Sequence, residues 1–226
     1  MAQLHRWASP ARDSRETTLL LIRHGETVWN LEGRVQGHSD SALTAKGHAQ
    51  AQQIAQHLAS LTIDAIYASD RSRAFETAHY LADPRGIEVI RRDGLRERCY
   101  GVLEGKTMAE AAAIQEPWLA TWQQDRHSAL PEGESQQEMS DRCLGALQEI
   151  AAAHPAQTVA VATHGGPIKA LVYAILHIPM AAWPLTWIDN GSITVLRGTP
   201  ELMRVACFND TCHLGGPPPQ TSEGEA

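Results

Sequence analysis

The sequence contains few cysteines and no long hydrophobic run. Among its 226 residues are four cysteines, Cys99, Cys143, Cys207 and Cys212, and their spacing matches no disulfide framework. We expect four free thiols, and a zinc site around Cys207, Cys212 and His213 is disfavoured because no fourth ligand is evident. No segment reaches the roughly 20 consecutive apolar residues that span a bilayer. These absences predict a soluble, cytoplasmic protein without a membrane partner.

Basic residues are outnumbered by acidic ones. The chain has 19 lysines and arginines against 26 aspartates and glutamates, which gives a formal net charge of −7. Proteins that bind nucleic acids draw their affinity from many Lys and Arg contacts to phosphate. The composition therefore argues against nucleic acid as a partner, and any cationic site must be local.

Short segments rich in β-branched and aliphatic residues alternate with segments of helical pattern. We predict strands at 17–23, 63–68, 87–91, 157–163, 190–196 and 202–208. A chain of this length forms one large domain, which we place at residues 17–214. The flanking segments 1–16 and 215–226 are expected to be flexible, because they contain charged residues, proline and glycine without an apolar pattern.

Helix start signals lie between the predicted strands. Thr44 precedes apolar residues spaced three or four apart and is suited to cap a helix. Ser135 with Glu138, and Thr107 with Glu110, have the spacing of capping boxes. Because helices separate the strands, we predict an α/β fold. Its expected form is a three-layer α/β/α sandwich around a mainly parallel, mixed central sheet, whose last two strands form an antiparallel edge.

The first predicted strand ends in an arginine and a histidine. The apolar run Thr18–Ile22 leads directly into Arg23, His24 and Gly25. Open α/β folds bind ligands at the carboxyl ends of their strands, where these side chains would lie. Imidazole is nucleophilic near neutral pH, and a guanidinium fits phosphate oxygens. The pair indicates phosphoryl transfer through histidine, although an isolated Arg-His pair is more often a solvated strand end.

Five segments of the chain decide between these interpretations. In order they are Arg23–Thr27 with Asn30; Gly33–Gly37 and Asp40–Thr44 with Gly47; Ser69–Ala74 with Thr77 and Ala78; Leu95–Glu97 with Gly101, Glu104 and Gly105; and Thr163–Gly166. Together they resemble the histidine phosphatase superfamily, in the branch typified by cofactor-dependent phosphoglycerate mutase. One departure is Ser41-Ala42, which stands where the family usually shows a proline before the leucine. The resemblance implies a phosphoglycerate mutase-like fold.

The resemblance also implies a role for each matched residue. His24 would attack phosphorus, with one ring nitrogen held by a backbone carbonyl, and Glu97 would protonate the leaving oxygen and then activate water. To act first as an acid, Glu97 needs a raised pKa, which partial burial beside the substrate phosphate would supply. Arg23, Arg73 and His164 would complete the catalytic set. The expected phosphate-binding residues are Arg23, Asn30, Gln36, Gly37, Arg73, His164 and Gly165.

The predicted topology explains how such distant residues could meet. The pair Arg23–His24 follows the first strand, and Arg73 lies about one turn into a helix expected to open at Ser69–Asp70. His164–Gly165 follows the strand 157–163. All three segments therefore reach one edge of the sheet, where the helix N-termini would direct backbone donors toward an anion.

The remaining histidines have weaker claims to the site. His38 follows Gln36 and Gly37 and is expected to approach the substrate. By contrast, His48, His57, His79 and His154 are expected on solvated helix faces.

The interval between Glu97 and His164 bears on the reaction. Family mutases tend to have a longer insertion there, with extra arginines, whereas this interval resembles the short lid of the family's phosphatases. We therefore favour hydrolysis of a small phosphorylated metabolite through a phosphohistidine; a phosphoglycerate mutase and a noncatalytic phosphate-binding module are kept as alternatives. Within the interval, Trp118 and Trp122 are interpreted as packing residues. The roles of Trp118, Trp122, Arg126 and His127 in choosing the substrate stay open.

No metal and no cofactor are expected. The arginines and histidines would provide the positive charge that a metal provides elsewhere, and the chain shows neither a paired-carboxylate metal site nor a Walker-type loop. Only the mutase alternative would require 2,3-bisphosphoglycerate. Sugar phosphates, phosphoglycerate, nucleotides and α-ribazole phosphate all fit the substrate class. The other partner considered is a second copy of the chain, in a homodimer.

Overall fold

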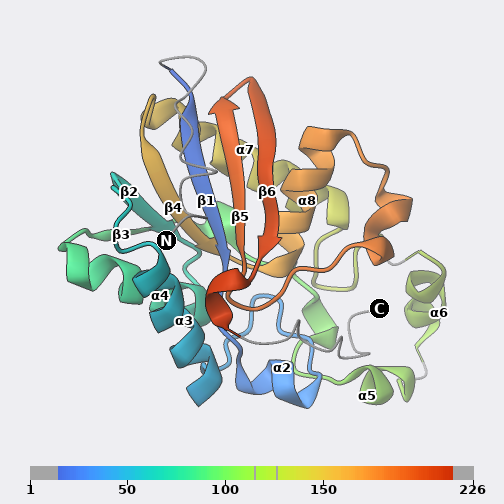
Figure 1. The fold of residues 1–226 in the computed structure, drawn as a ribbon. Coiled ribbons are helices and arrows are strands. Elements are labelled where there is room, and N and C mark those ends of the chain that lie inside the picture. The colour runs from blue at the N-terminus through green and yellow to red at the C-terminus, as the bar shows by residue number, and fades with distance from the viewer. Residues whose placement is uncertain (1–14, 115, 126, 216–226) are drawn as a thin grey trace.

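A six-stranded sheet forms the centre of the computed structural model (Figure 1). The structure describes residues 15–114, 116–125 and 127–215. Its strands are β1 (Thr17–Arg23), β2 (Ala65–Ala68), β3 (Val89–Arg91), β4 (Thr158–Thr163), β5 (Ile193–Thr199) and β6 (Leu202–Asp210). They lie in the order β3-β2-β4-β1-β5-β6. The first four are parallel, β5 is antiparallel to β1, and β6 is antiparallel to β5. The predicted mixed sheet with an antiparallel edge is confirmed.

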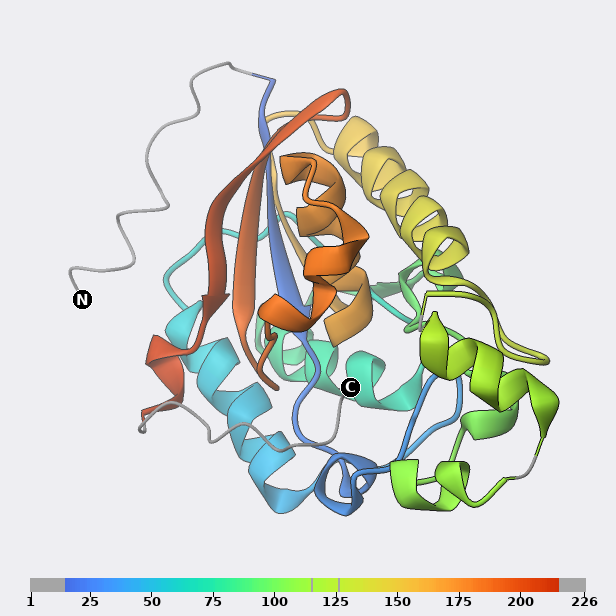
Figure 2. The same cartoon turned by 90° about the vertical axis from the view of Figure 1, so that its right-hand side faces the viewer.

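Helices cover both faces of this sheet, as Figure 2 shows in a view turned by 90°. Alternate residues of β1 point to opposite faces: Leu19 and Leu21 pack with α7 and α8, and Leu20 and Ile22 pack with α3 and α4. Because both faces are buried, β1 is continuously apolar. The helices are α2 (Val28–Glu32), α3 (Ala45–His57), α4 (Ser72–Ala82), α5 (Met108–Ala112), α6 (Pro117–Gln124), α7 (Gln136–Ala153) and α8 (Gly165–Leu176). The three-layer sandwich is therefore confirmed.

The predicted helix caps are present. The Thr44 side chain accepts a hydrogen bond from the third residue of α3, Gly47, at 3.0 Å. Thr107 and Ser135 both form complete capping boxes. These local signals set the starts of α3, α5 and α7 because each cap satisfies a backbone N–H that the helix cannot pair.

Helix α4 begins later than predicted. It starts at Ser72, and the expected opening at Ser69–Asp70 is wrong. The Asp70 carboxylate is already engaged by Arg71 and Arg96, whereas Asp40 from a distant loop accepts the Ser72 N–H at 2.8 Å. A long-range carboxylate thus replaces the local cap, and Arg73 lies in the first turn.

Strand β5 also begins three residues later than predicted. Residues 189–191 form a turn, and the Gly191 N–H donates to the carbonyls of Arg23 and His24 at 3.1 and 3.2 Å. This turn is therefore tied to the end of β1 instead of continuing the strand.

A small separate core lies beyond the carboxyl edge of the sheet. It consists of buried residues from α5, α6 and the segments beside them: Leu103, Ala111, Leu119, Trp122 and Leu130. We call residues 104–130 the lid. Trp122 is 5% exposed and Trp118 packs against the same cluster, so their interpretation as packing residues is confirmed. Arg126 lies outside the described residues.

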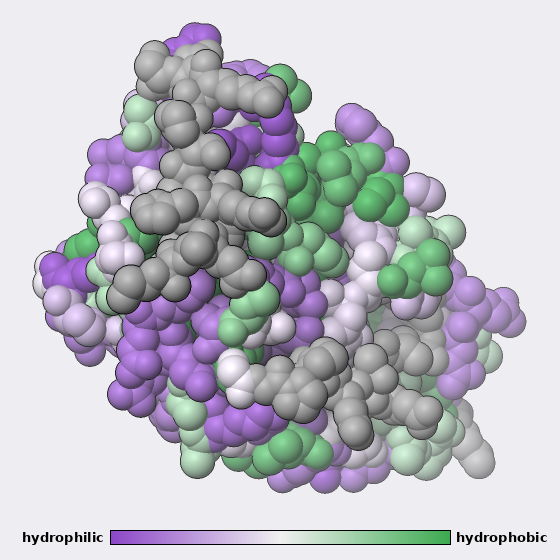
Figure 3. Space-filling model, in the orientation of Figure 1, coloured by the Kyte–Doolittle hydropathy of each residue, from purple (hydrophilic) through white to green (hydrophobic). Residues whose placement is uncertain are grey.

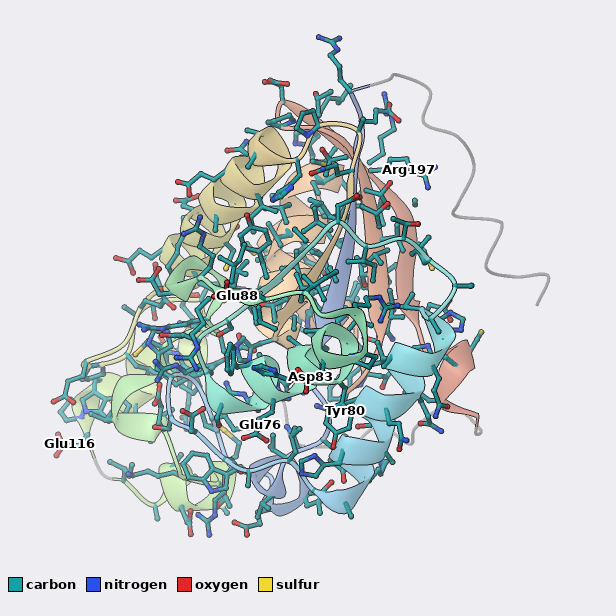
Figure 4. All side chains as sticks on the ribbon, turned by 90° about the vertical axis from the view of Figure 1, so that its left-hand side faces the viewer. Glu76, Tyr80, Asp83, Glu88, Glu116 and Arg197 are labelled. Atoms are coloured by element: carbon teal, nitrogen blue, oxygen red, sulfur yellow. The ribbon has the colours of Figure 1, made fainter. Side chains whose placement is uncertain are left out.

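The outer surfaces differ in character. Along α4, Glu76, Tyr80 and Asp83 lie on the side away from the sheet (Figure 4). Hydrophobic residues gather over α8 and the segment that follows it (Figure 3), where Leu176 and Leu185 are exposed. No helix in the described part of the chain is long and apolar enough to cross a membrane.

Two histidines differ from the expected solvated positions. His57 is half-buried and stacks on His213 with the ring centroids 5.1 Å apart. His154 is also half-buried, and its Nε2 lies 2.9 Å from the Tyr67 hydroxyl. His57 is the last residue of α3 and His154 follows the end of α7, and each ring is covered by a residue from a distant segment. The segments 1–14 and 216–226, which include most of the flanks predicted to be flexible, lie outside the described residues.

Candidate active site

His24 lies immediately after β1 and is 3% exposed. Its Nδ1 lies 2.8 Å from the Gly25 carbonyl oxygen. Since a carbonyl can only accept, Nδ1 carries the proton and Nε2 keeps its lone pair. Burial, together with the charges of Arg73 and Arg23, holds the pKa of His24 well below its usual value. The expected contact with a backbone carbonyl is confirmed, and the ring is neutral at neutral pH with a lone pair on Nε2.

Two glycines allow the loop of His24 to pack against α3. A Cβ atom at Gly25 would lie 2.8 Å from the carbonyl carbon of Gly47, closer than real Cβ atoms approach such atoms. The Gly25 N–H donates to the Thr77 hydroxyl of α4 at 3.1 Å. Two helices on the same face of the sheet therefore fix the backbone that presents His24.

His164 faces His24 from the next strand of the sheet. It follows β4, is fully buried, and its ring centroid lies 5.2 Å from that of His24. Its Nε2 lies 2.9 Å from the Ser69 hydroxyl. Burial and the nearby Arg73, His24 and Arg23 hold the pKa of His164 well below its usual value. Both rings are therefore neutral in the free enzyme.

Arg73 brings a buried positive charge to the two histidines. It is 1% exposed, and its Nη1 and Nη2 donate to the carbonyls of Ser39 and Gly37 at 2.7 and 2.8 Å. Burial lowers the pKa of Arg73 to about 10, so the guanidinium stays charged at neutral pH. Gly37 has a φ of +56°, and a Cβ there would lie 2.6 Å from Cδ of Glu104. The positive φ and the lack of room for a Cβ atom both favour glycine at position 37. The predicted contact of Gly37 with phosphate stays a prediction.

Arg23 is the second buried cation of the site. Its Nη1 donates to the carbonyl of Ile188, and its guanidinium carbon would lie 3.5 Å from a Cβ placed on Gly165. A Cβ there would be in ordinary van der Waals contact, so the guanidinium lies against the start of α8. Arg23 and Arg73 therefore flank the His24–His164 pair with two positive charges.

The half-buried carboxylate of Glu97 lies at the N-terminus of α8. Its Oε2 accepts the Gly166 N–H at 3.0 Å, and its Oε1 accepts the Arg98 N–H at 2.8 Å. A Cβ at Gly166 would lie 3.0 Å from the Glu97 Cδ and closer still to Oε1. The Glu97 carbonyl accepts from His38 Nε2 at 2.9 Å and from Arg142 Nη2 at 3.2 Å. The carboxylate is thus held at the same end of the sheet as both histidines.

Asn30 and Gln36, two of the predicted phosphate-binding residues, differ in their hydrogen bonds. Asn30 Oδ1 accepts from the Thr27 N–H and from Asn190 Nδ2, at 3.1 and 3.2 Å, so this oxygen orders the loop after β1. The buried Gln36 Oε1 has no hydrogen-bond partner among the described residues. Their predicted contacts with phosphate stay predictions.

Two residues that position the site were given no role from the sequence. Asn190 donates to the His24 carbonyl at 3.1 Å and so ties the turn before β5 to the loop of His24. Glu104 accepts from four donors, the N–H groups of His38, Ser39 and Tyr100 and the Ser39 hydroxyl. This carboxylate joins the loop that binds Arg73 to the segment that carries Glu97. The only available signal was the place of Glu104 within the fourth matched segment.

Residues 19–211 match the model of one protein family, the histidine phosphatase superfamily (branch 1). The chain belongs to this superfamily. The match begins inside β1 and runs past the end of β6, so it includes residues from all six strands and every residue of the site described above.

Three known proteins show how this histidine phosphatase relates to others. It is 39% identical over 203 residues to a probable phosphoglycerate mutase, GpmB, of Enterobacter sp. strain 638, covering 87% of this chain and 94% of the relative. It is 32% identical over 198 residues to phosphoserine phosphatase 1 of Hydrogenobacter thermophilus, with the same coverage. Its fold is similar to that of YhfR from Bacillus stearothermophilus, with a TM-score of 0.82, 35% identity, and coverage of 88% and 99% of the two chains.

The site of this histidine phosphatase therefore combines two neutral imidazoles, two guanidinium groups and one carboxylate. The guanidinium groups supply charge for an anion, and His24 supplies a lone pair. No group of three or more His, Cys, Asp or Glu side chains in the described part of the chain is placed to hold a metal ion. The four cysteines are free thiols.

Proposed function

We propose that this histidine phosphatase hydrolyses small phosphomonoesters through a phosphohistidine at Nε2 of His24. The observation that carries the proposal is the tether between His24 Nδ1 and the Gly25 carbonyl, which leaves a lone pair on a buried, neutral ring beside Arg73. A neutral imidazole between buried cations is suited to attack a phosphorus atom whose oxygens those cations hold.

In the first half-reaction the phosphoryl oxygens bind Arg23, Arg73 and His164. Nε2 of His24 attacks phosphorus in line, the P–N bond forms, and the ester P–O bond breaks. Glu97 donates its proton to the leaving oxygen, so the alcohol departs neutral. The donors around the phosphoryl group stabilise the charge on its oxygens in the transition state.

In the second half-reaction water cleaves the phosphohistidine. Glu97, now ionised, takes a proton from the water, the new P–O bond forms, and the P–N bond breaks to release inorganic phosphate. His24 regains its lone pair and Glu97 its proton. In the free protein, two backbone N–H groups donate to the Glu97 carboxylate, an arrangement that supports its role as the base of this step.

The short lid supports hydrolysis over phosphoryl exchange. It contains two helices of five and eight residues packed on their own small core. The phosphatase relative from Hydrogenobacter also supports hydrolysis, whereas the probable mutase from Enterobacter supports the alternative. A cytoplasmic location and a homodimer are further proposals, and cell fractionation and analytical ultracentrifugation test them.

A phosphate-release screen tests the proposal. The panel contains phosphoserine, 3-phosphoglycerate, sugar phosphates, nucleotides and α-ribazole phosphate. We expect phosphate release from at least one ester and no exchange between 2- and 3-phosphoglycerate when 2,3-bisphosphoglycerate is added. Exchange without net release would instead establish a mutase.

Trapping the intermediate tests the role of His24. Brief incubation with labelled substrate should give an adduct that is stable to alkali and labile to acid. His24→Ala should lose both the adduct and turnover, whereas His48→Ala, which changes an exposed histidine of α3, should keep both. Substantial turnover by a folded His24→Ala protein would contradict covalent catalysis.

A further inference from the structure

Ser69 lies between the two strands that carry the site. It follows β2, is fully buried, and its N–H donates to the Ala162 carbonyl of β4 at 2.9 Å. This pairing places its hydroxyl next to His164, which comes two residues after Ala162, and the Oγ to Nε2 distance is 2.9 Å. Ser69 opens the third matched segment, but the helix expected to begin there begins at Ser72.

The hydrogen bonds around Ser69 determine where its proton lies. Its Oγ accepts the Arg71 N–H at 3.3 Å. A hydroxyl has one proton to donate, and His164 Nε2 is its only hydrogen-bond acceptor among the described residues. If Nε2 carried the proton instead, two buried groups would bond to none of them, the hydroxyl proton and the lone pair of His164 Nδ1, whereas the opposite tautomer leaves only the Nδ1 proton unpaired. Each unpaired buried group costs about 1–3 kcal/mol. The chain of donors therefore runs from Arg71 N–H to the Ser69 hydroxyl to Nε2.

The other nitrogen of His164 then becomes a donor. The ring is neutral, so a lone pair on Nε2 requires the proton on Nδ1. His164 Nδ1 is buried and has no hydrogen-bond partner in the described part of the chain. His24 holds its proton on the same atom, but there the Gly25 carbonyl occupies Nδ1 and the lone pair of Nε2 is left for the substrate.

We propose that Ser69 is a positioning residue that donates to His164 Nε2 and so directs the Nδ1 proton of His164 toward a phosphoryl oxygen. The two histidines share one tautomer but present opposite groups to the substrate, because a carbonyl holds one ring and a hydroxyl holds the other. Without the hydroxyl, His164 can place its proton on Nε2 and turn a lone pair toward an anionic oxygen. Only the contact with the phosphoryl oxygen rests on the proposed function.

Nitrogen NMR of the resting enzyme tests the tautomer directly. Protein with ¹⁵N-labelled histidine is measured without phosphate at pH 7.5, and a His164→Asn sample assigns the signals. We expect a protonated Nδ1 and an unprotonated Nε2 on His164. Ser69→Ala should move the proton to Nε2 or mix the two forms. Ser192→Ala is the matched control, because Ser192 is equally buried and its hydroxyl has no hydrogen-bond partner among the described residues.

Kinetics give the second readout. A misdirected donor in a site of this kind lowers the rate by about 10²- to 10³-fold, so we expect that loss in kcat/KM for Ser69→Ala and little change for Ser192→Ala. A protonated Nε2 in the wild type, an unchanged tautomer in Ser69→Ala, or equal losses in the two variants would overturn the proposal. If Ser69→Ala does not fold, the wild-type spectrum decides. If the enzyme releases no phosphate from any ester, the proposed function fails, but the spectrum still decides the role of Ser69.

Discussion

Gly166→Ala should inactivate the enzyme without unfolding it. A Cβ at this position would lie 3.0 Å from the Glu97 Cδ, whereas carbon atoms in contact are about 3.5–4.0 Å apart. Because Oε1 lies closer still to this Cβ, the carboxylate must retreat by about 1 Å or more. A displacement of about 1 Å costs about 10²-fold in rate, and loss of general acid catalysis costs 10²- to 10⁴-fold. Because the obstacle is the far end of a flexible side chain, we expect the fold to be retained.

The assay is kcat for an alkyl phosphate, with urea unfolding measured in parallel. Gly145→Ala in α7 is the control, since a Cβ there meets nothing within 4 Å, and alanine should stabilise that helix by about 0.5–1 kcal/mol. A Gly166→Ala enzyme with kcat within threefold of the wild type would refute the assignment of proton transfer to Glu97. Equal losses in the two glycine variants would indicate a general effect on folding.

Three further results are expected. Glu97→Gln should slow hydrolysis of an alkyl phosphate by about 10²- to 10⁴-fold. With an activated aryl phosphate it should show a burst, because cleavage of the phosphohistidine becomes slow. Equal losses of activity on the two substrates and no burst would contradict proton transfer by Glu97. Dialysis against EDTA should leave the rate unchanged, because Arg23, Arg73 and His164 provide the charge; activity restored by zinc or magnesium would contradict it. Burial lowers the pKa of His24 and His164 in the native state, so below about pH 6.5 the unfolded chain binds more protons than the native protein does. The free energy of unfolding should therefore decrease as the pH is lowered, by up to about 1.4 kcal/mol per pH unit for each histidine. Urea unfolding in phosphate-free buffer checks this last result, and His24→Gln should reduce the slope.

The parts of the fold that the sequence predicts correctly have local causes. Thr44 caps α3 because its own side chain reaches the third residue of that helix, and β1 is recognisable because both of its faces are buried. The convergence of His24 and His164 follows from topology, since β1 and β4 are parallel neighbours and both residues follow the strand ends.

The parts that sequence reasoning missed depend on contacts between distant segments. The start of α4 is set by Asp40, more than 30 residues away, and the start of β5 by a turn tied to His24. Glu104 and Asn190 act on backbone groups, which every residue has and which leave no pattern in the side chains. Such contacts become visible only when the packed chain is seen.

The small core of the lid has a consequence for how the sequence of this enzyme can vary. Its four buried residues, Ala111, Leu119, Trp122 and Leu130, belong to neither of the two hydrophobic clusters on the sheet faces. Changes in α5 and α6 that leave Glu104 in place therefore spare the two clusters on the sheet faces and the residues of the site. The lid helices can vary in sequence while the sheet that carries His24 and His164 keeps its packing.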